Sequence, residues 1–117
     1  MESKLKELVK ELNGLVSNGQ LVDAAEKFYA PNVKTIEYDG SVTEGKLATM
    51  KKLIDFVDSI QNVKKIELLR SAADGNASFS EYILDFDMKD GSNVYLHEII
   101  RALWEDGKVV EERYFKG

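Results

Sequence analysis

The sequence contains no cysteine, one proline, one histidine and no long apolar run. The absence of cysteine excludes disulfides, thiolate metal sites and cysteine nucleophiles. A single histidine, His97, with no sulfur ligand beside it argues against a transition-metal site. No segment approaches the roughly 18 apolar residues that cross a bilayer, and the charged N-terminus lacks the apolar stretch of a secretion signal. We therefore expect a cytoplasmic protein with no membrane partner.

Positive charge is also scarce. The chain has 16 Lys and Arg residues against 21 Asp and Glu residues, which gives a net charge of −5. The two halves of the chain share this balance, so no basic patch favours nucleic acid as a partner. The glycine-rich patterns GxGxxG and GxxxxGK, which bind phosphates, are missing, and no serine lies in a nucleophile-elbow sequence. We expect no cofactor and no Ser-His-Asp triad.

Apolar residues recur at helical spacing in the first half of the chain. They predict a helix over about 4–17, with Ser3 as its cap, and a short helix from Leu21 that ends before Pro31. A third helix is expected from Thr43, as its cap, to Ile60. A short strand over Val33 to Asp39 separates the second helix from the third. Four long strands then follow, at about 63–73, 77–88, 94–104 and 109–116, joined by turns that contain Asp74-Gly75, Asp90-Gly91 and Asp106-Gly107.

Helices followed by a strand meander predict one α+β domain over residues 1–117. Long strands twist and coil, so the sheet should bend strongly and hold the three helices on its concave face. We expect a cone-shaped half-barrel with a mainly antiparallel sheet and the element order ααβαββββ.

The strand at 94–104 is apolar on both faces, whereas a strand covered on one face alternates cleanly. Leu96, Ile100 and Trp104 share one face, and Tyr95, Ile99 and Leu103 share the other. Because the three helices can cover only one side of the sheet, the second set should be covered by another molecule. We expect a homodimer through this outer face.

Three stretches resemble the SnoaL-like domains of the nuclear transport factor 2-like superfamily. They are Phe28 to Val33 before the first strand, Thr43 to Lys46 at the third helix, and Trp104 to Phe115 at the end of the chain. The resemblance covers nearly the whole chain and implies the cone-shaped α+β fold. It is weak on function, because the family includes isomerases, polyketide cyclases, epoxide hydrolases, dehydratases and binding modules.

Glu37 lies late in the first strand, where the resemblance to ketosteroid isomerases places the general base. A carboxylate at the mouth of an apolar cone would have a raised pKa, which suits proton abstraction near neutral pH. The alternative is a solvated glutamate beside a turn. Glu98 is the second candidate for a catalytic carboxyl. It shares its face with Leu96 and Ile100, so it is either a buried acid that needs a partner or a surface residue.

Aromatic and apolar side chains should form the walls of a ligand cavity around these two acids. The candidates for substrate contact are Tyr38, Phe56, Tyr82, Phe86, Ile100, Trp104 and Tyr114. His97 falls on the opposite face from Glu98 and is expected to be structural. The run Glu111-Glu112-Arg113 is interpreted as a solvated edge.

The chain also departs from its catalytic relatives. The isomerases that it resembles carry a tyrosine on the first helix and a protonated aspartate on the strand matching 94–104. Here Leu12 and Ile100 stand near those places, and the Asp-Arg-Asp set of the epoxide hydrolases is missing. Two interpretations therefore stay open. The chain is a protein or enzyme that binds an unknown small molecule, apolar and polyketide- or steroid-like, or it is a noncatalytic module with a filled cone. A cavity of about 300 Å³ or more favours the first.

Overall fold

The computed structural model describes residues 2–117, with side chains from Lys4 onward. The predicted Ser3 cap thus lies outside the described side chains. The three helices are α1 (Glu2–Ser17), α2 (Leu21–Phe28) and α3 (Lys46–Asp58). The strands are β1 (Tyr29–Ile36), β2 (Val42–Glu44), β3 (Ile60–Asp74), β4 (Ala77–Met88), β5 (Asn93–Glu105) and β6 (Lys108–Lys116).

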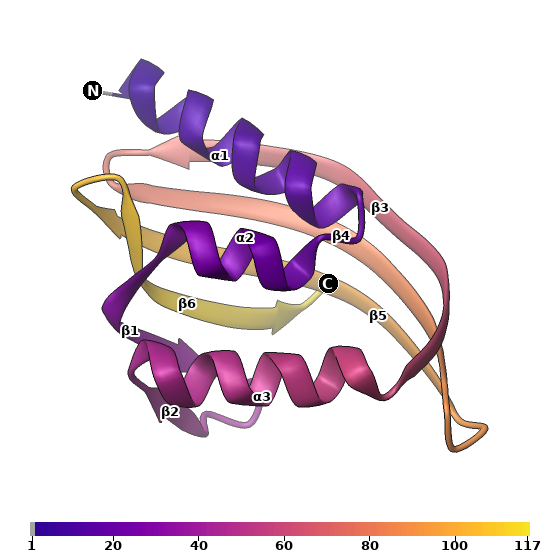
Figure 1. Cartoon of the computed structure of the whole chain (residues 1–117). Helices are drawn as coiled ribbons and strands as arrows, with labels where there is room; N and C mark the ends of the chain where they lie inside the picture. The colour runs from indigo at the N-terminus through magenta and orange to yellow at the C-terminus, as the bar shows by residue number, and fades with distance from the viewer. Residues whose placement is uncertain (1) are drawn as a thin grey trace.

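All six strands form one sheet in the order β2-β1-β6-β5-β4-β3. The pair β1–β6 is parallel and the other neighbours are antiparallel. The three helices lie in front of this sheet, on its concave face, with α1 over β3 and α3 over β1 (Figure 1). The predicted fold class is therefore confirmed.

The sheet bends because its long strands contain irregularities. The pairing of β3 with β4 shifts register in three places, and that of β5 with β6 shifts between Leu103 and Trp104. Leu103 pairs with Glu111 and Trp104 with Val109, which leaves Val110 as an extra residue in β6. Such bulges sharpen the local twist of a strand. The bulge at Val110 also decides which β6 side chains face the helices.

Two boundaries near β1 differ from the sequence prediction. The first strand begins at Tyr29, because the extended conformation that Pro31 imposes on Ala30 starts the strand directly after α2. The second difference is β2, which the sequence did not predict. Thr43 lies in this strand and pairs with Thr35, so it does not cap α3. Gly45 precedes α3 instead, with a φ of 91° that favours glycine.

The hydrophobic core lies where α1 and α2 meet the sheet. Phe28 and Trp104 pack edge to face, with ring centroids 5.7 Å apart. Leu5, Val9 and Val109 join them in one buried cluster. The Trp104 indole donates a hydrogen bond to the Ser78 hydroxyl at 3.0 Å. This cluster fixes one end of the helical layer on the sheet.

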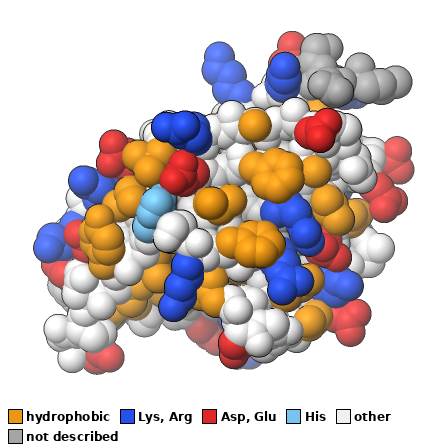
Figure 2. Space-filling model, turned by 180° about the vertical axis from the view of Figure 1, so that it is seen from behind, with side chains coloured by type: hydrophobic (Ala, Val, Ile, Leu, Met, Phe, Trp, Pro, Cys, Tyr) orange, Lys and Arg blue, Asp and Glu red, His pale blue; other side chains and the backbone are white. Residues whose placement is uncertain are grey.

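The outer face of the sheet is the convex side of β4 and β5, and the helices leave it uncovered (Figure 2). Tyr95 is 61% exposed and Phe79 is 39% exposed there. Polar contacts interrupt the apolar side chains, since His97 contacts Glu81 at 2.6 Å and Arg101 forms an ion pair with Glu111 at 2.7 Å. The homodimer through Tyr95, Ile99 and Leu103 stays a prediction. In residues 2–117, no helix is long and apolar enough to cross a membrane.

Candidate functional site

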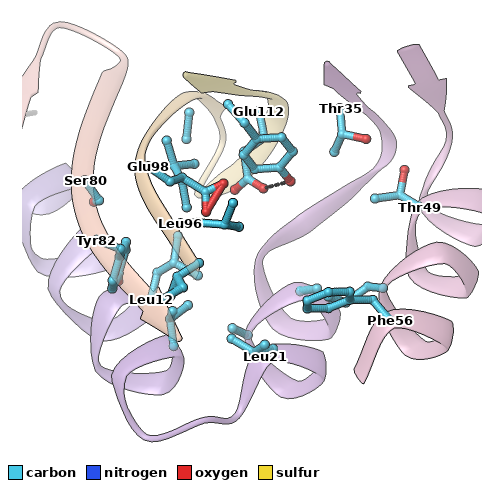
Figure 3. A pocket seen from close by; sticks show the side chains of 18 of the residues that line it. Leu12, Leu21, Thr35, Thr49, Phe56, Ser80, Tyr82, Leu96, Glu98 and Glu112 are labelled. Carbon is cyan, nitrogen blue, oxygen red and sulfur yellow. Dashed lines mark hydrogen bonds between the residues drawn. The ribbon is translucent and has the colours of Figure 1, made fainter. Parts of the chain in front are cut away.

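A cavity of about 370 Å³ lies between the three helices and the concave face of the sheet (Figure 3). Most of its wall is apolar, with Leu12 from α1, Leu21 from α2 and Phe56 from α3 facing Leu96 and Ile100 from β5. Its volume exceeds the 300 Å³ that separates an open cone from a filled one. The interior therefore has room for a small ligand.

Glu98 brings a carboxyl group into this apolar space. Its residue is only 7% exposed, and its Oε1 accepts a hydrogen bond from the Tyr38 hydroxyl at 3.1 Å. Burial raises the pKa of Glu98 from 4.5 to about 7, and the nearby Glu112 and Glu37 carboxylates add to the rise, against the opposing Tyr38 hydrogen bond. The raised pKa means that both protonation states are populated at neutral pH.

Glu112 is a second buried carboxyl, and the sequence interpretation of a solvated edge was wrong for it. The Tyr29 and Tyr114 hydroxyls both donate to its Oε1, each at 2.6 Å. Burial raises the pKa of Glu112, against the two hydrogen bonds. The bulge at Val110 explains the error, because it places Glu112 opposite Ala102 and Tyr114 opposite Ile100 on the concave face. Figure 3 shows the Glu98 and Glu112 carboxyl groups turned into the cavity.

Asn13 is a third polar group that the sequence reasoning missed. Its Oδ1 accepts hydrogen bonds from the Tyr82 hydroxyl at 2.8 Å and the Ser80 hydroxyl at 3.0 Å. The residue is 5% exposed and lines the cavity from α1. The sequence does indicate that Asn13 is buried, because Leu5, Val9 and Asn13 are spaced by four residues on one helix face. A polar residue in that apolar stripe needs a buried partner.

Glu37 lies at the cavity but is not the free carboxylate that the sequence analysis expected. It directly follows β1, and its Oε2 contacts the Lys52 ammonium at 2.7 Å. The Lys52 ammonium also donates to the Thr43 hydroxyl at 3.1 Å. About a third of the Glu37 side chain is exposed. The ion pair therefore forms part of the rim rather than the interior.

The other predicted site residues mostly lie in the cavity wall. The structure places there Tyr38, Phe56, Tyr82, Phe86, Ile100 and Tyr114. Phe56 and Phe86 contact each other edge to face. The prediction that Trp104 contacts the ligand was wrong, because its ring packs in the core beside Phe28. The Trp104 side chain does point to the concave face, but it lies at the end of β5 where α1 and α2 pack against the sheet.

The cavity brings together groups that can accept and donate protons. In the described part of the chain, no group of three or more His, Cys, Asp or Glu side chains could hold a metal ion. The cavity offers two carboxyls of raised pKa, tyrosine hydroxyls and one amide. Carboxyls in such an environment are suited to accept and return protons.

The comparisons with known proteins agree with the fold. Residues 4–116 match the model of the SnoaL-like domain family. No curated protein matches the chain.

Among solved structures, a candidate SnoaL-like polyketide cyclase from Mesorhizobium loti is 23% identical. Its TM-score is 0.85, and the match covers 95% of this chain and 97% of that one. A protein of ketosteroid isomerase-like fold from Catenulispora acidiphila, in complex with trimethylamine, has a TM-score of 0.75 at 12% identity, with coverages of 95% and 85%. TerC, co-crystallised with polyporic acid, has a TM-score of 0.73 at 10% identity, with coverages of 95% and 89%. With a family match over nearly its whole length, this chain belongs to the SnoaL-like domain family.

Proposed function

We propose that this protein binds a small, largely apolar organic molecule in the cavity and moves a proton on it, with Glu98 as general base and general acid. The observation that carries the proposal is the position of Glu98, which is buried in the apolar cavity with a pKa of about 7. A general acid–base group works best when its pKa lies near the working pH. Glu98 meets that condition.

Glu98 is a better base than the two other carboxyls. Glu37 is tied to Lys52 at the rim. Glu112 already accepts hydrogen bonds from two tyrosine hydroxyls, and its proximity helps to raise the pKa of Glu98. Glu98 has a single hydrogen bond, from Tyr38, among the residues described. Its carboxylate thus has more free acceptor capacity inside the cavity than that of Glu112.

The proposed step is proton transfer from a carbon next to a carbonyl group. The C–H bond breaks, the proton goes to the Glu98 carboxylate, and the electron pair moves onto the carbonyl oxygen. In an isomerisation, the electron pair returns from the oxygen and Glu98 gives the proton to another carbon of the ligand. In a ring closure, the enolate carbon forms a bond to a second carbonyl carbon of the ligand, and Glu98 gives the proton to the oxygen of that carbonyl. The Asn13 amide also lines the cavity, and its N–H groups can donate hydrogen bonds to the developing negative charge.

The family relationship supports a small-molecule role. The Mesorhizobium loti relative is a candidate polyketide cyclase, and TerC was crystallised with polyporic acid. A noncatalytic role keeps one argument, the exposed apolar side chains of the outer face. The open cavity gives no support to a filled cone. Catalysis is therefore the feature that an experiment must establish.

The test uses 5-nitrobenzisoxazole, a small apolar compound whose ring opens when a base removes its C–H proton. The protein should accelerate this opening above buffer, and the rate should rise with pH through a midpoint of about 7. Glu98→Gln should lose at least about a hundredfold of the catalysed rate. Glu44→Gln is the matched control, since Glu44 is exposed on β2, and it should retain the rate. A Glu98→Gln rate equal to that of the unaltered protein would refute Glu98 as the base.

A further inference from the structure

Among the side chains that the structure describes, the two carboxyls inside the cavity have no basic partner. Glu98 is contacted by the Tyr38 hydroxyl, and Glu112 by the hydroxyls of Tyr29 and Tyr114. Within residues 4–117, the ion pairs to lysine, arginine and histidine involve neither carboxyl. Buried carboxylates are ordinarily paired, because removing a charge from water is costly. The cavity therefore lacks a countercharge for its two acids.

Lys52, which lines the cavity, and Lys116, which pairs with Glu98 in the sheet register, both make other contacts. The Lys52 ammonium contacts the Glu37 carboxylate at 2.7 Å and the Thr43 hydroxyl at 3.1 Å. Lys116 pairs with Glu98 across the strands, but its ammonium lies over the Tyr38 ring, 5.5 Å from the ring centre. Lys116 is exposed. Neither ammonium reaches the Glu98 or Glu112 carboxyl group, so the described residues supply no positive charge to the two acids.

Aromatic rings surround the same space. The cavity wall contains Tyr29, Tyr38, Phe56, Tyr82, Phe86 and Tyr114. The faces of aromatic rings carry partial negative charge and attract organic cations, most strongly where water is excluded. Lys116 lies over the Tyr38 ring, so one of these rings already contacts a cation from the chain itself. Two carboxyls inside an aromatic cavity thus form a site that favours a positively charged ligand.

We propose that the ligand of this cavity is an organic cation, a molecule whose alkyl- or arylammonium group lies against the aromatic walls beside Glu98 and Glu112. This inference rests on the proposed function, because it names the ligand class for the same cavity. The ammonium group supplies the countercharge that residues 4–117 do not provide. The apolar remainder of the ligand fills the space lined by Leu12, Leu96 and Ile100. An anionic ligand is disfavoured by the same two acids.

The proposal requires a pH dependence set by Glu98. The titratable groups around its carboxyl are Tyr38, Tyr82, Glu112, Glu37 and, at the rim, Lys52 and Lys116. With a pKa of about 7, Glu98 is about nine-tenths ionised at pH 8 and about one-tenth ionised at pH 6. The affinity for a cation should therefore fall about tenfold between pH 8 and pH 6. A neutral ligand should not show this loss.

The experiment compares two probes of the same shape, phenyltrimethylammonium and tert-butylbenzene, by titration calorimetry with the full chain. At pH 8 the cation should bind at least about tenfold more tightly than its neutral isostere. Glu98→Gln and Glu112→Gln should each reduce this preference, and Glu44→Gln should leave it unchanged. Thermal unfolding of each variant shows whether it is folded.

Each other outcome overturns the inference. If tert-butylbenzene binds as tightly as the cation, the cavity takes apolar ligands without a charge preference, and the proposed proton transfer is untouched. If Glu44→Gln lowers the preference as much as Glu98→Gln does, the attraction comes from the overall charge of the protein. If neither probe binds, the ligand site in the cavity is refuted together with the cation.

Discussion

Replacing Glu98 with glutamine should stabilise the protein at pH 8 and change its stability little at pH 4. Burial raises the pKa of Glu98 in the folded protein to about 7, whereas the unfolded chain has an ordinary carboxyl pKa near 4.5. Between these two values the folded protein binds more protons than the unfolded chain. The free energy of unfolding therefore falls as pH rises from about 4.5 to about 7, and it stays low above pH 7.

The size of the effect follows from the difference between the two pKa values. Their separation is 7 − 4.5 = 2.5 units, and each unit corresponds to about 1.4 kcal/mol. Glu98 thus costs the folded protein about 3 kcal/mol at pH 8. Glutamine has nearly the same shape and keeps an oxygen that can accept the Tyr38 hydrogen bond, but it carries no charge. Glu98→Gln should recover most of this energy.

Urea denaturation of both proteins at pH 4 and pH 8 measures the effect. The variant should unfold at a higher urea concentration at pH 8, and the two proteins should unfold together at pH 4. Glu44→Gln is the control for a change in net charge, because Glu44 is exposed on β2. A Glu98→Gln variant that gains the same stability at both pH values, or that loses stability at pH 8, would refute the reasoning.

The outer face and the α1 wall give two further predictions. Ile99→Asp should yield monomers, because it places a charge in the expected dimer contact. Light scattering should give a mass of about twice 13.2 kDa for the unaltered chain. A mass of 13.2 kDa for the unaltered chain at micromolar concentration would contradict the dimer. Asn13→Leu should lower the free energy of unfolding by about 1–3 kcal/mol, because the Tyr82 and Ser80 hydroxyls lose their shared acceptor. Urea denaturation measures this loss, and an unchanged midpoint would mean that the two hydroxyls find other partners.

The fold could be predicted from the sequence because its signals are local. The Asp-Gly turns set the boundaries of the last four strands to within three residues, and apolar spacing located the three helices. Strand alternation also placed Glu98 on the concave face with Ile100, since β5 is regular between them. The short β2 was missed because three residues, Val42–Glu44, carry no periodicity.

The candidate site was less predictable, because its polar groups depend on long-range contacts. The partners of Glu112 are Tyr29, 83 residues away, and Tyr114. The bulge at Val110 brings them to one face, and a sequence of alternating residues cannot show where a bulge falls. The pair between Glu37 and Lys52 likewise needs the α3 position over β1. Trp104 was assigned to the correct face, but packing against Phe28 removed it from the cavity.

The pKa of Glu98 is the quantity on which the account depends, and ¹³C NMR of the side-chain carboxyls can measure it. In protein labelled at the glutamate carboxyl carbons, the Glu98 signal is the one that disappears in Glu98→Gln. Glu112→Gln identifies the signal of the other buried carboxyl in the same way. The account predicts that the Glu98 signal titrates with a midpoint of about 7. A midpoint near 4.5 would contradict it, because Glu98 would then be an ordinary solvated carboxylate and not an acid–base group held in an apolar cavity.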